Sequence, residues 1–553
     1  MFRTSRQMVR AAHPFAFDTS TPMAICRRHK LLLAALLIGH GLLAWQLRAR
    51  GIFTFGDDAA YLLLGRALQA FSYREPYFVG NPVAARFPPG YPAFLAVLTA
   101  PAGEHLGLIS LAGILVSIAG LVFLFDVVRR RWSTELAFLV TAAAAVNPEL
   151  LTNASNVRSE TLYTTLTLAS LWAADRAVGQ RNSRERGTRA ALVAGGLAIV
   201  AALTRSVGVT LIGALGMHWL ARRRYRWVMV FGAAATLTVG AWLAWTVVAP
   251  AREVRRSYVD DAMNIRVGDG SLRSTMVARL KENITGYVGQ SVIEQLALPV
   301  TPRTRLDNVG WVLAIGALLT VGLISAWGRW NAVVWYVGAY GALLAVWAWT
   351  IERFLGPVIP LLVALIVIGA GVASSVLARN RRWLPPAVVT MVLAGFALRE
   401  DAQLVTRALE CDRARVDCAL PRELDFVDAV AYLATHSAPD ARVISPKAPS
   451  LYYHAKRQAL FWDEVLNLPL DSLDGFLRQE RVSYILTTPV FSDGESIVRL
   501  SRRDCARLDL VRAFSPRTML LAVRPEGAPP ATESAACRAL KRAETIPFQD
   551  VPR

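Results

Sequence analysis

Long apolar runs recur along most of the chain, and they restrict its possible folds more than any other feature. A helix needs about 20 residues to cross a hydrocarbon core of about 30 Å. Hydrophobic residues make up 54% of the 553 positions, which include 15 Trp. These observations predict a polytopic α-helical membrane protein with about eleven spans, at residues 31–47, 106–128, 135–148, 159–175, 189–204, 207–221, 227–249, 309–327, 331–350, 354–378 and 384–399.

Basic residues are distributed unevenly between the segments that connect these runs. Clusters such as "RRHK", "VVRRR" and "LARNRR" lie at alternate ends. Because basic loops stay on the cytoplasmic side, we expect the N-terminal segment 1–30 to be cytoplasmic and the long loops 48–105 and 250–308 to be outside. An odd number of spans then places residues 400–553 outside, in an inner (plasma) membrane protein of the cell envelope. The net charge of +20 at pH 7 fits these arginines and anionic lipid headgroups, so no nucleic-acid partner is expected.

The chain divides into a transmembrane domain, residues 31–399, and an extracytoplasmic domain, residues 400–553. In the second part "ARVISPK", "RVSYILTT" and "TMLLAVRP" predict strands, whereas "LDFVDAVAYLATHS" and "LDSLDGFLRQE" predict amphipathic helices. We therefore expect a small α/β domain, with a role in acceptor binding or structure rather than catalysis. The tail after about residue 526 is expected to be loosely ordered.

Four of the five cysteines lie in the predicted outer domain, where disulfides persist. They permit three pairings. We expect Cys411 to pair with Cys418, which closes a short loop, and Cys505 to pair with Cys537, which holds the tail. The alternative is four free, buried thiols.

Two adjacent acids, Asp57 and Asp58, follow the first apolar run in "GIFTFGDDAAYLLLGRALQAF". One interpretation is a solvated charge pair or a helix N-cap, because a helical pattern begins directly after it. The same loop carries Arg86 and Tyr91 in "ARFPPGYPAFLAVL", where the chain re-enters the membrane. Acidic and basic groups thus share one predicted outer loop, which favours a functional role.

Other ionisable residues lie at predicted outer ends of spans. "NASNVRSETLYTTL" contains Arg158 and Glu160, "ALTRSVG" contains Arg205, and "WTIERFLGPVIPLL" contains Arg353. Each of these side chains could simply extend to the membrane interface. Because all of them are predicted on the same, outer side of the membrane, a shared function is favoured.

The chain resembles the GT-C superfamily of polytopic glycosyltransferases, in particular bacterial protein O-mannosyltransferases and aminoarabinose lipid A transferases (glycosyltransferase family 39-like). The resemblance rests on "FGDDAAYLLLGRAL", "RFPPGYPAFLA", "NVRSETLYTTL", "LTRSVG", "ERFLGPVIPLL" and "VISPKAPSLYYHAKRQ" in this order. It implies an inverting transfer of a sugar from a polyprenyl-phosphate donor to an acceptor hydroxyl at the outer face of the membrane. The acceptor is a glycan, a lipid or a protein.

The resemblance also implies roles for the polar residues. A carboxylate of the acidic pair, Asp57 or Asp58, would accept the hydroxyl proton, and arginines would stabilise the departing phosphate. Arg158 is less favoured for this role because Glu160 is expected to neutralise it. The expected phosphate-binding residues are Arg86, Arg353 and Arg205, and the expected substrate-binding or orienting residues are Glu160, Arg158, Tyr61 and Tyr91.

No cofactor is predicted, although some superfamily members bind a divalent ion at the acidic motif. A competing hypothesis is a transporter or flippase, in which the same arginines would guide an anionic or lipid-linked substrate. Transporters usually carry charges within their spans, whereas the ionisable groups here gather at the ends of spans. Transfer is therefore favoured over transport.

Overall fold

The structure, a computed structural model, describes twelve stretches of the chain. Residues 1–26, parts of the loop 250–308, and Cys418 lie outside them. The chain forms two units: unit 1 comprises Met1–Arg48, Ser110–Gly240 and Ile265–Thr406, and unit 2 comprises Ala49–Ile109, Ala241–Asn264 and Arg407–Arg553. The described residues are 27–52, 57–101, 103–179, 184–252, 272–300, 308–348, 352–377, 384–414, 421–460, 473–490, 494–525 and 534–545.

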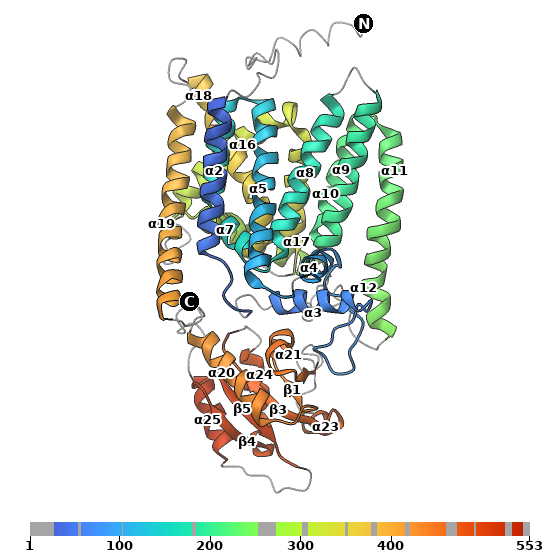
Figure 1. Cartoon of the computed structure of the whole chain (residues 1–553), viewed down its shortest axis with the longest axis vertical. Helices are drawn as coiled ribbons and strands as arrows, with labels where there is room; N and C mark the ends of the chain where they lie inside the picture. Colours follow the sequence, from blue (N-terminus) through green and yellow to red (C-terminus); the bar gives the residue numbers. More distant parts are fainter. Residues whose placement is uncertain are drawn as a thin grey trace. The chain divides into compact units, whose positions relative to one another are not determined.

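Unit 1 is largely a bundle of long helices (Figure 1). A helix lies within or across every apolar run predicted from the sequence, since continuous apolar stretches favour helices whose backbone groups are bonded internally. Its principal elements are α2 (Arg27–Gln46), α5 (Leu106–Arg131), α6 (Thr134–Ala145), α7 (Pro148–Ser155), α8 (Ser159–Gly179), α9 (Arg184–Thr204), η1 (Ser206–Gly208), α10 (Val209–Ala221), α11 (Tyr225–Ala235), α14 (Leu272–Gly286), α15 (Val292–Gln295), α16 (Val309–Arg329), α17 (Asn331–Val346), η4 (Glu352–Val358), α18 (Ile359–Leu377) and α19 (Leu384–Ala414).

The described residues include five helices that are long and apolar enough to cross a membrane. A sixth candidate is the pair α6 and α7, which bends by 64°. Asn147 and Pro148 account for the break, because the Asn147 side chain caps the new helix by accepting from the Leu150 N–H at 3.2 Å. Other predicted runs form shorter helices, such as α10 and α17. The count of about eleven spans therefore stays a prediction.

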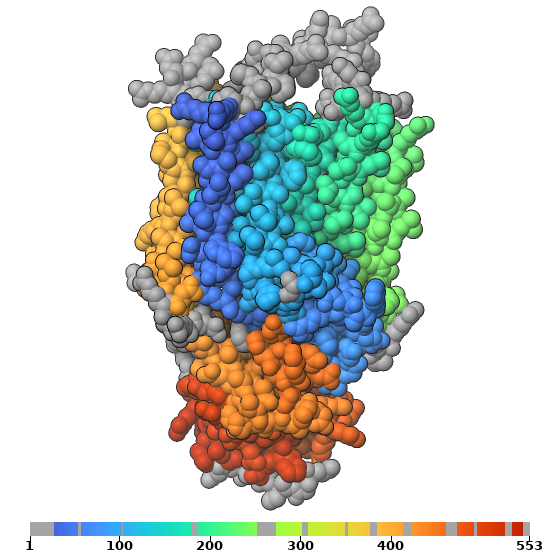
Figure 2. Space-filling view, viewed as in Figure 1, coloured from blue at the N-terminus to red at the C-terminus, as the bar shows by residue number. Residues whose placement is uncertain are grey.

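Large apolar side chains are exposed on the outside of the helical bundle. On α2, dark blue in Figure 2, they include Leu31, Ile38 and Leu42, and on α11 they include Met229 and Val230. Monomeric soluble proteins rarely expose apolar patches of this kind without a partner. Hydrocarbon is the partner that suits these faces.

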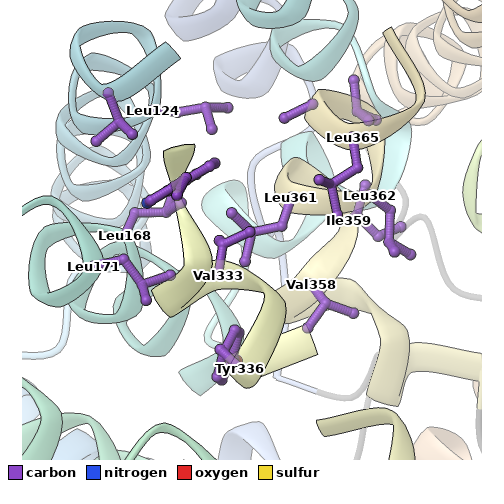
Figure 3. Packing of buried hydrophobic residues seen from close by; sticks show 14 of the residues in the cluster. Leu124, Leu168, Leu171, Val333, Tyr336, Val358, Ile359, Leu361, Leu362 and Leu365 are labelled. Carbon is purple, nitrogen blue, oxygen red and sulfur yellow. The ribbon is translucent and has the colours of Figure 1, made fainter. Parts of the chain in front are cut away.

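The core of unit 1 is formed by leucine, valine and alanine side chains from many helices. Figure 3 shows part of it, with Leu124 of α5, Leu168 of α8 and Leu361 of α18 among the labelled side chains. Most of α18 is buried, which fits its nearly continuous apolar sequence. This helix leads directly out of η4, which carries Arg353.

Helices α16 and α18 pack through reciprocal glycine contacts. A Cβ atom added to Gly322 would overlap the Leu365 carbonyl oxygen, and one added to Gly369 would overlap the Leu318 carbonyl oxygen. Only glycine allows the two backbones to approach this closely, as in other helix pairs packed through small residues.

Unit 2 contains a five-stranded sheet with the order β2-β1-β3-β5-β4. Strands β2, β1 and β3 are parallel, whereas β5 is antiparallel to both β3 and β4. The elements of this unit are α3 (Asp58–Gln69), α4 (Gly90–Thr99), α12 (Ala241–Arg252), α20 (Pro421–His436), β1 (Arg442–Ile444), α21 (Ala448–Ala455), β2 (Gln458–Ala459), α23 (Leu473–Gln479), β3 (Val482–Thr487), α24 (Gly494–Arg503), β4 (Leu508–Ala513), β5 (Met519–Val523) and α25 (Ala535–Thr545).

Successive strand residues contribute to two different apolar clusters. Val443 and Leu486 belong to a cluster with α20 and α21, whereas Ile444 and Ile485 belong to a cluster with α23, α24 and α25. Because side chains alternate between the two faces of a sheet, each face of this sheet is covered by helices. The predicted α/β arrangement of the C-terminal residues is present here, and the domain boundaries predicted from the sequence stay a prediction.

The first long loop extends this sheet. The Val79 N–H donates to the Ala459 carbonyl at 3.0 Å, and the Ala459 N–H donates to the Tyr77 carbonyl at 2.9 Å. The Gln458 side chain also donates to the Pro76 carbonyl at 3.1 Å. The loop that carries the acidic pair is therefore tied to the edge strand β2 by backbone bonds.

The predicted disulfide between Cys505 and Cys537 is present. It joins the turn before β4 to α25, and the apolar side of α25 packs through Ala536, Leu540 and Ala543. The expectation of a loosely ordered tail is therefore wrong for Ala535–Thr545, because the disulfide and this apolar side fix the helix. Cys411 is also disulfide-bonded, and its expected partner Cys418 lies outside the described residues.

Candidate functional site

Asp57 and Asp58 lie at the start of α3, as the sequence pattern predicts. Asp57 occupies the N-cap position, but its side chain makes no capping hydrogen bond. Asp58 is only 3% exposed, and its Oδ1 accepts from the Ala59 N–H at 2.8 Å. The pair therefore consists of one half-buried and one buried carboxylate, and Asp57 does not act as a side-chain cap.

Burial raises the pKa of Asp58 to about 6, and the charge of Asp57 adds to this increase. The Ala59 N–H and the ammonium group of Lys447 act in the opposite direction. Burial also raises the pKa of Tyr453, with contributions from Glu104 and Asp58. Lys447 is the N-cap residue of α21 and Tyr453 lies within this helix. Because α21 and α3 share one apolar cluster, α21 brings titratable groups to the acidic pair.

Aromatic side chains line the helix pair that holds the acids. The ring of Tyr61 lies 4.9 Å from that of Tyr91 and 5.1 Å from that of Phe87, both in edge-on contacts. Tyr61 belongs to α3 and Tyr91 to α4, so the contact connects the acidic pair with the end of the loop. The structure thus brings together the two tyrosines expected to bind or orient substrate.

Arg86 lies in the same loop, one residue before Phe87, and its side chain is exposed. Two bonds fix the backbone around it: the Tyr73 hydroxyl donates to the Phe87 carbonyl at 2.7 Å, and the Trp245 indole donates to the Ala84 carbonyl at 3.1 Å. Arg86 also acts on the buried Tyr77, where it opposes the increase in pKa caused by burial and by Glu75.

A second polar cluster lies in unit 1, where α7, α8, η1 and η4 meet. Glu160, 2% exposed, forms an ion pair with Arg205 at 2.8 Å and lies 3.9 Å from the Arg353 Nε. The Arg205 guanidinium also donates to the Ser159 hydroxyl at 2.8 Å. Residues from three separate segments of the sequence therefore surround one buried carboxylate.

Arg158 belongs to the same cluster but has different partners. Its guanidinium donates to Asn153 Oδ1 at 2.7 Å and lies 3.4 Å from Glu149 Oε1. Asn153 in turn donates to Glu149 Oε1 at 3.0 Å. The sequence suggests that Glu160 neutralises Arg158. In the structure, the closest ion pair of Glu160 is instead with Arg205. These contacts join three arginines with two glutamates, and Glu400 adds a further negative charge near Glu149.

Sequence reasoning did not identify Glu149, Asn153, Ser159 or Lys447. Asn153 and Ser159 lie within "NASNVRSE", next to Arg158 and Glu160, so their polarity is a signal in the sequence. Lys447 lies within "VISPKAPSLYYHAKRQ", one of the segments that carry the resemblance, but its approach to α3 depends on the packing of α21. Among the described residues, no group of three His, Cys, Asp or Glu side chains is placed to hold a metal ion. The absence of a cofactor stays a prediction.

Comparison with known proteins gives matches only at the level of structure. No protein-family model matches the sequence, and no curated protein matches it. The crystal structure of ArnT from Cupriavidus metallidurans bound to undecaprenyl phosphate is similar with a TM-score of 0.53 and 14% identity, over 91% of this chain and 99% of ArnT. Its apo state gives a TM-score of 0.54, 14% identity and coverage of 88% and 97%.

An archaeal oligosaccharyltransferase has a similar fold. AglB from Archaeoglobus fulgidus, in complex with an inhibitory peptide and a dolichol-phosphate, has a TM-score of 0.55 and 11% identity, over 94% of this chain and 78% of AglB. At these identities the likeness concerns the fold. The chain therefore shares the fold of ArnT and AglB.

Proposed function

We propose that the chain is a membrane glycosyltransferase that transfers a sugar from a polyprenyl-phosphate donor to an acceptor hydroxyl. The observation that carries this proposal is the acidic pair at the start of α3, with one carboxylate buried, in a chain of this fold. The similar structures support a lipid-linked donor, because ArnT was solved with undecaprenyl phosphate bound and AglB in complex with a dolichol-phosphate.

In the proposed reaction Asp57 accepts the proton of the acceptor hydroxyl as its oxygen bonds to the anomeric carbon. The bond between that carbon and the phosphate oxygen breaks, and its electron pair leaves with the polyprenyl phosphate. Attack opposite the leaving group inverts the anomeric centre. Asp57 is preferred as the base because it is half-buried and able to meet substrate, whereas Asp58 is buried beside it.

Arginine side chains stabilise the phosphate as it departs. Their charge is fixed and their forked donors match phosphate oxygens, so binding strengthens as negative charge develops. We assign this role to Arg86 in the loop of the acidic pair, and the residue types of Arg205 and Arg353 suit the same role. Glu160 orients Arg205 through their ion pair and keeps it from adopting other conformations. Tyr61 and Tyr91 present aromatic surface to a substrate.

The direct test is donor turnover. Purified protein in detergent, given a radiolabelled polyprenyl-phosphate sugar and a pool of envelope acceptors, should release free polyprenyl phosphate and label an acceptor. The matched control is the variant in which both Asp57 and Asp58 are changed to Asn. A transporter or flippase would move the lipid-linked sugar across vesicle membranes without cleaving it. That outcome would contradict the proposal.

A further inference from the structure

Helix α5 presents an apolar face on the outside of unit 1. Leu111, Leu115 and Val122 lie on one side of this helix, and they are 45%, 58% and 39% exposed. From Leu111 to Val122 the helix rises by about 17 Å, which is close to half of a hydrocarbon core of about 30 Å. This face therefore suits the acyl chains of one bilayer leaflet.

The same face of α5 ends in charged side chains. Asp126 and Arg130 follow Val122 at steps of four residues, so they lie on the same side of the helix. Asp126 Oδ2 accepts from Arg130 Nε at 2.7 Å, and its Oδ1 accepts from the Arg129 guanidinium at 2.9 Å. The outside of α5 thus changes from apolar to charged along one strip, as a phospholipid does from its tails to its head group.

Helix α8 adds an aromatic ring and a second guanidinium to this charged end. The half-buried ring of Trp172 lies 5.1 Å from that of Phe123 on α5, and its indole N–H donates to Asp126 Oδ2 at 2.9 Å. The Arg176 guanidinium lies 3.8 Å from the centroid of the Trp172 ring and 3.4 Å from Asp126 Oδ2. Tryptophan is enriched at membrane interfaces because its ring is apolar and its N–H is polar.

The carboxylate at this end pairs with more cations than it can neutralise. Asp126 forms ion pairs with three arginines, among them Arg130 and Arg176. It is the one carboxylate in the described part of the chain that pairs with either of these two. The neighbouring Asp175 accepts from Arg131 Nε at 2.6 Å. The side chains of Arg130 and Arg176 are 34% and 37% exposed, so part of their donor set is open to an anion.

The tendency of basic loops to stay in the cytoplasm also accounts for arginines at this end of the spans. That tendency depends on charge and requires no particular contacts. Arg189, near the start of α9, fits it without further features, since its side chain is 76% exposed and pairs with Glu185 of the same helix. Arg176 differs, because an indole ring of its own helix and a carboxylate of α5 fix its guanidinium. A guanidinium fixed in this way is prepared for binding.

We propose that the outer faces of α5 and α8, at the carboxyl-terminal ends of these helices, bind an anionic phospholipid. Its phosphate accepts from Arg130 and Arg176, because forked guanidinium donors match phosphate oxygens. Its acyl chains lie against Val122 and the rest of the apolar face of α5. Basic sites between helix ends on the cytoplasmic side take anionic head groups, and the sequence predicts that this end is cytoplasmic.

The lipid site is separate from the polar cluster around Glu160. Arg176 lies about 24 Å beyond Glu160 along the axis of α8, at a rise of about 1.5 Å per residue. The proposal therefore does not depend on the proposed function.

The test measures lipid binding to the full-length protein in a neutral detergent by native mass spectrometry, which resolves each bound lipid by its mass. The wild type should bind a first phosphatidylglycerol more tightly than a first phosphatidylcholine by about 10-fold or more. Arg130→Gln and Arg176→Gln should each reduce this preference by about 5-fold, the effect of one basic side chain on an anionic lipid. The matched control is Arg189→Gln, which makes the same change of charge outside the cluster and should keep the preference.

A purely structural role of the two arginines predicts a different result. If they only hold α5 and α8 together around Asp126, the variants lower the thermal midpoint and keep the preference for the anionic lipid. That result overturns the proposal, as does an equal loss of preference in Arg189→Gln. A wild type without preference between the two lipids also overturns it, and this comparison decides the question even where a variant does not fold.

Free glycerol 3-phosphate tests the part played by the apolar face. It carries the same phosphate without acyl chains, so it should not displace phosphatidylglycerol at equal concentration. Displacement would overturn the phospholipid as the ligand. None of these measurements uses sugar transfer, so a protein that binds the lipid but has no transferase activity would refute the proposed function alone.

Discussion

Asp57 and Asp58 are adjacent residues of the same type, yet their side chains lie in different surroundings. Asp57 remains half-buried at the N-cap position, whereas Asp58 is turned into unit 2 beside α21 and carries a raised pKa. Two adjacent carboxylates with separated environments are a common arrangement for acid–base chemistry. The difference makes the two residues separable by mutation.

Asp57→Asn keeps the shape of the side chain and removes the proton acceptor. We expect kcat for sugar transfer to fall by about 10² to 10⁴, with donor affinity largely retained, as measured by steady-state kinetics with labelled donor.

Arg86→Ala should lower both donor affinity and turnover, because it removes a charge that binds the phosphate. If Asp58→Asn is far more damaging than Asp57→Asn, the roles within the pair are exchanged. Wild-type rates in all three variants would exclude this loop from the active site.

Asp58→Asn should also stabilise the protein at neutral pH. The folded-state pKa is raised from 3.8 to about 6, so the folded protein binds this proton more tightly than the unfolded chain does. Stability from this group is present below about pH 4 and is lost as pH rises through 6. The asparagine does not ionise, so the variant should be more stable at pH 7 by about 2 to 3 kcal/mol and equal at pH 3.5. Thermal unfolding in detergent at both pH values checks this; a lower midpoint at pH 7 would contradict it.

The types of the site residues could be anticipated from the sequence, but their partners could not. Acids and arginines at the ends of apolar runs are visible as residue patterns. The pairing of Glu160 with Arg205, rather than with its neighbour Arg158, depends on how α8 and η1 pack. Lys447 reaches α3 only because apolar residues of α21 and α3 share one core.

At the scale of elements, α16 and α18 depend on two glycines. Gly369→Ala or Gly322→Ala should destabilise the protein by about 1 to 3 kcal/mol, because the added methyl group overlaps a carbonyl oxygen of the facing helix. Gly316→Ala in α16 is the matched control, since its Cβ would meet nothing within 4 Å, and it should be neutral or stabilising. Thermal midpoints in detergent distinguish these outcomes. Equal thermal midpoints for all three variants would mean that α16 and α18 move apart readily to make room for the added methyl group.

The helices were more predictable than the sheet. Apolar runs predict helices because a membrane leaves the backbone no other partner, and the acidic pair before a helical pattern marks the start of α3. Strands β1, β3 and β5 also follow from their β-branched and aliphatic residues. Strand β2 has two residues and exists through its neighbours, so no local signal predicts it. The sequence of α25, in contrast, consists of helix-forming residues with one apolar side, which is a local signal for a helix.

At the scale of the whole molecule, the distribution of basic residues predicts the membrane orientation. Reporter fusions after Arg131, Arg189 and Arg226 should report the cytoplasm, and fusions after Asp260 and Glu423 should report the outer compartment. Alkaline phosphatase and green fluorescent protein serve as opposite reporters. A cytoplasmic signal at Glu423 would contradict both the odd number of spans and an outer active site.

The cysteines provide a separate test of compartment. Non-reducing peptide mapping of protein from native membranes should find Cys505 linked to Cys537, as in the structure, and Cys411 linked to Cys418. Disulfides persist in oxidising compartments, so both links are expected if residues 400–553 are exported. Labelling of all four thiols without reductant would place these residues in the cytoplasm.

The backbone pairing of the first loop with β2 also has a consequence for biosynthesis. Pro76 and Gln458, which are hydrogen-bonded, lie 382 residues apart in the sequence. A ribosome adds about 5 to 20 residues per second, so about 20 to 80 s pass between synthesis of the two partners. During that interval the loop with Asp57 and Arg86 has no edge strand to hold it. The loop with Asp57 and Arg86 is therefore completed only after about four fifths of the chain has been made, and a chain released before residue 458 would contain every proposed catalytic residue and still lack the bonds that support them.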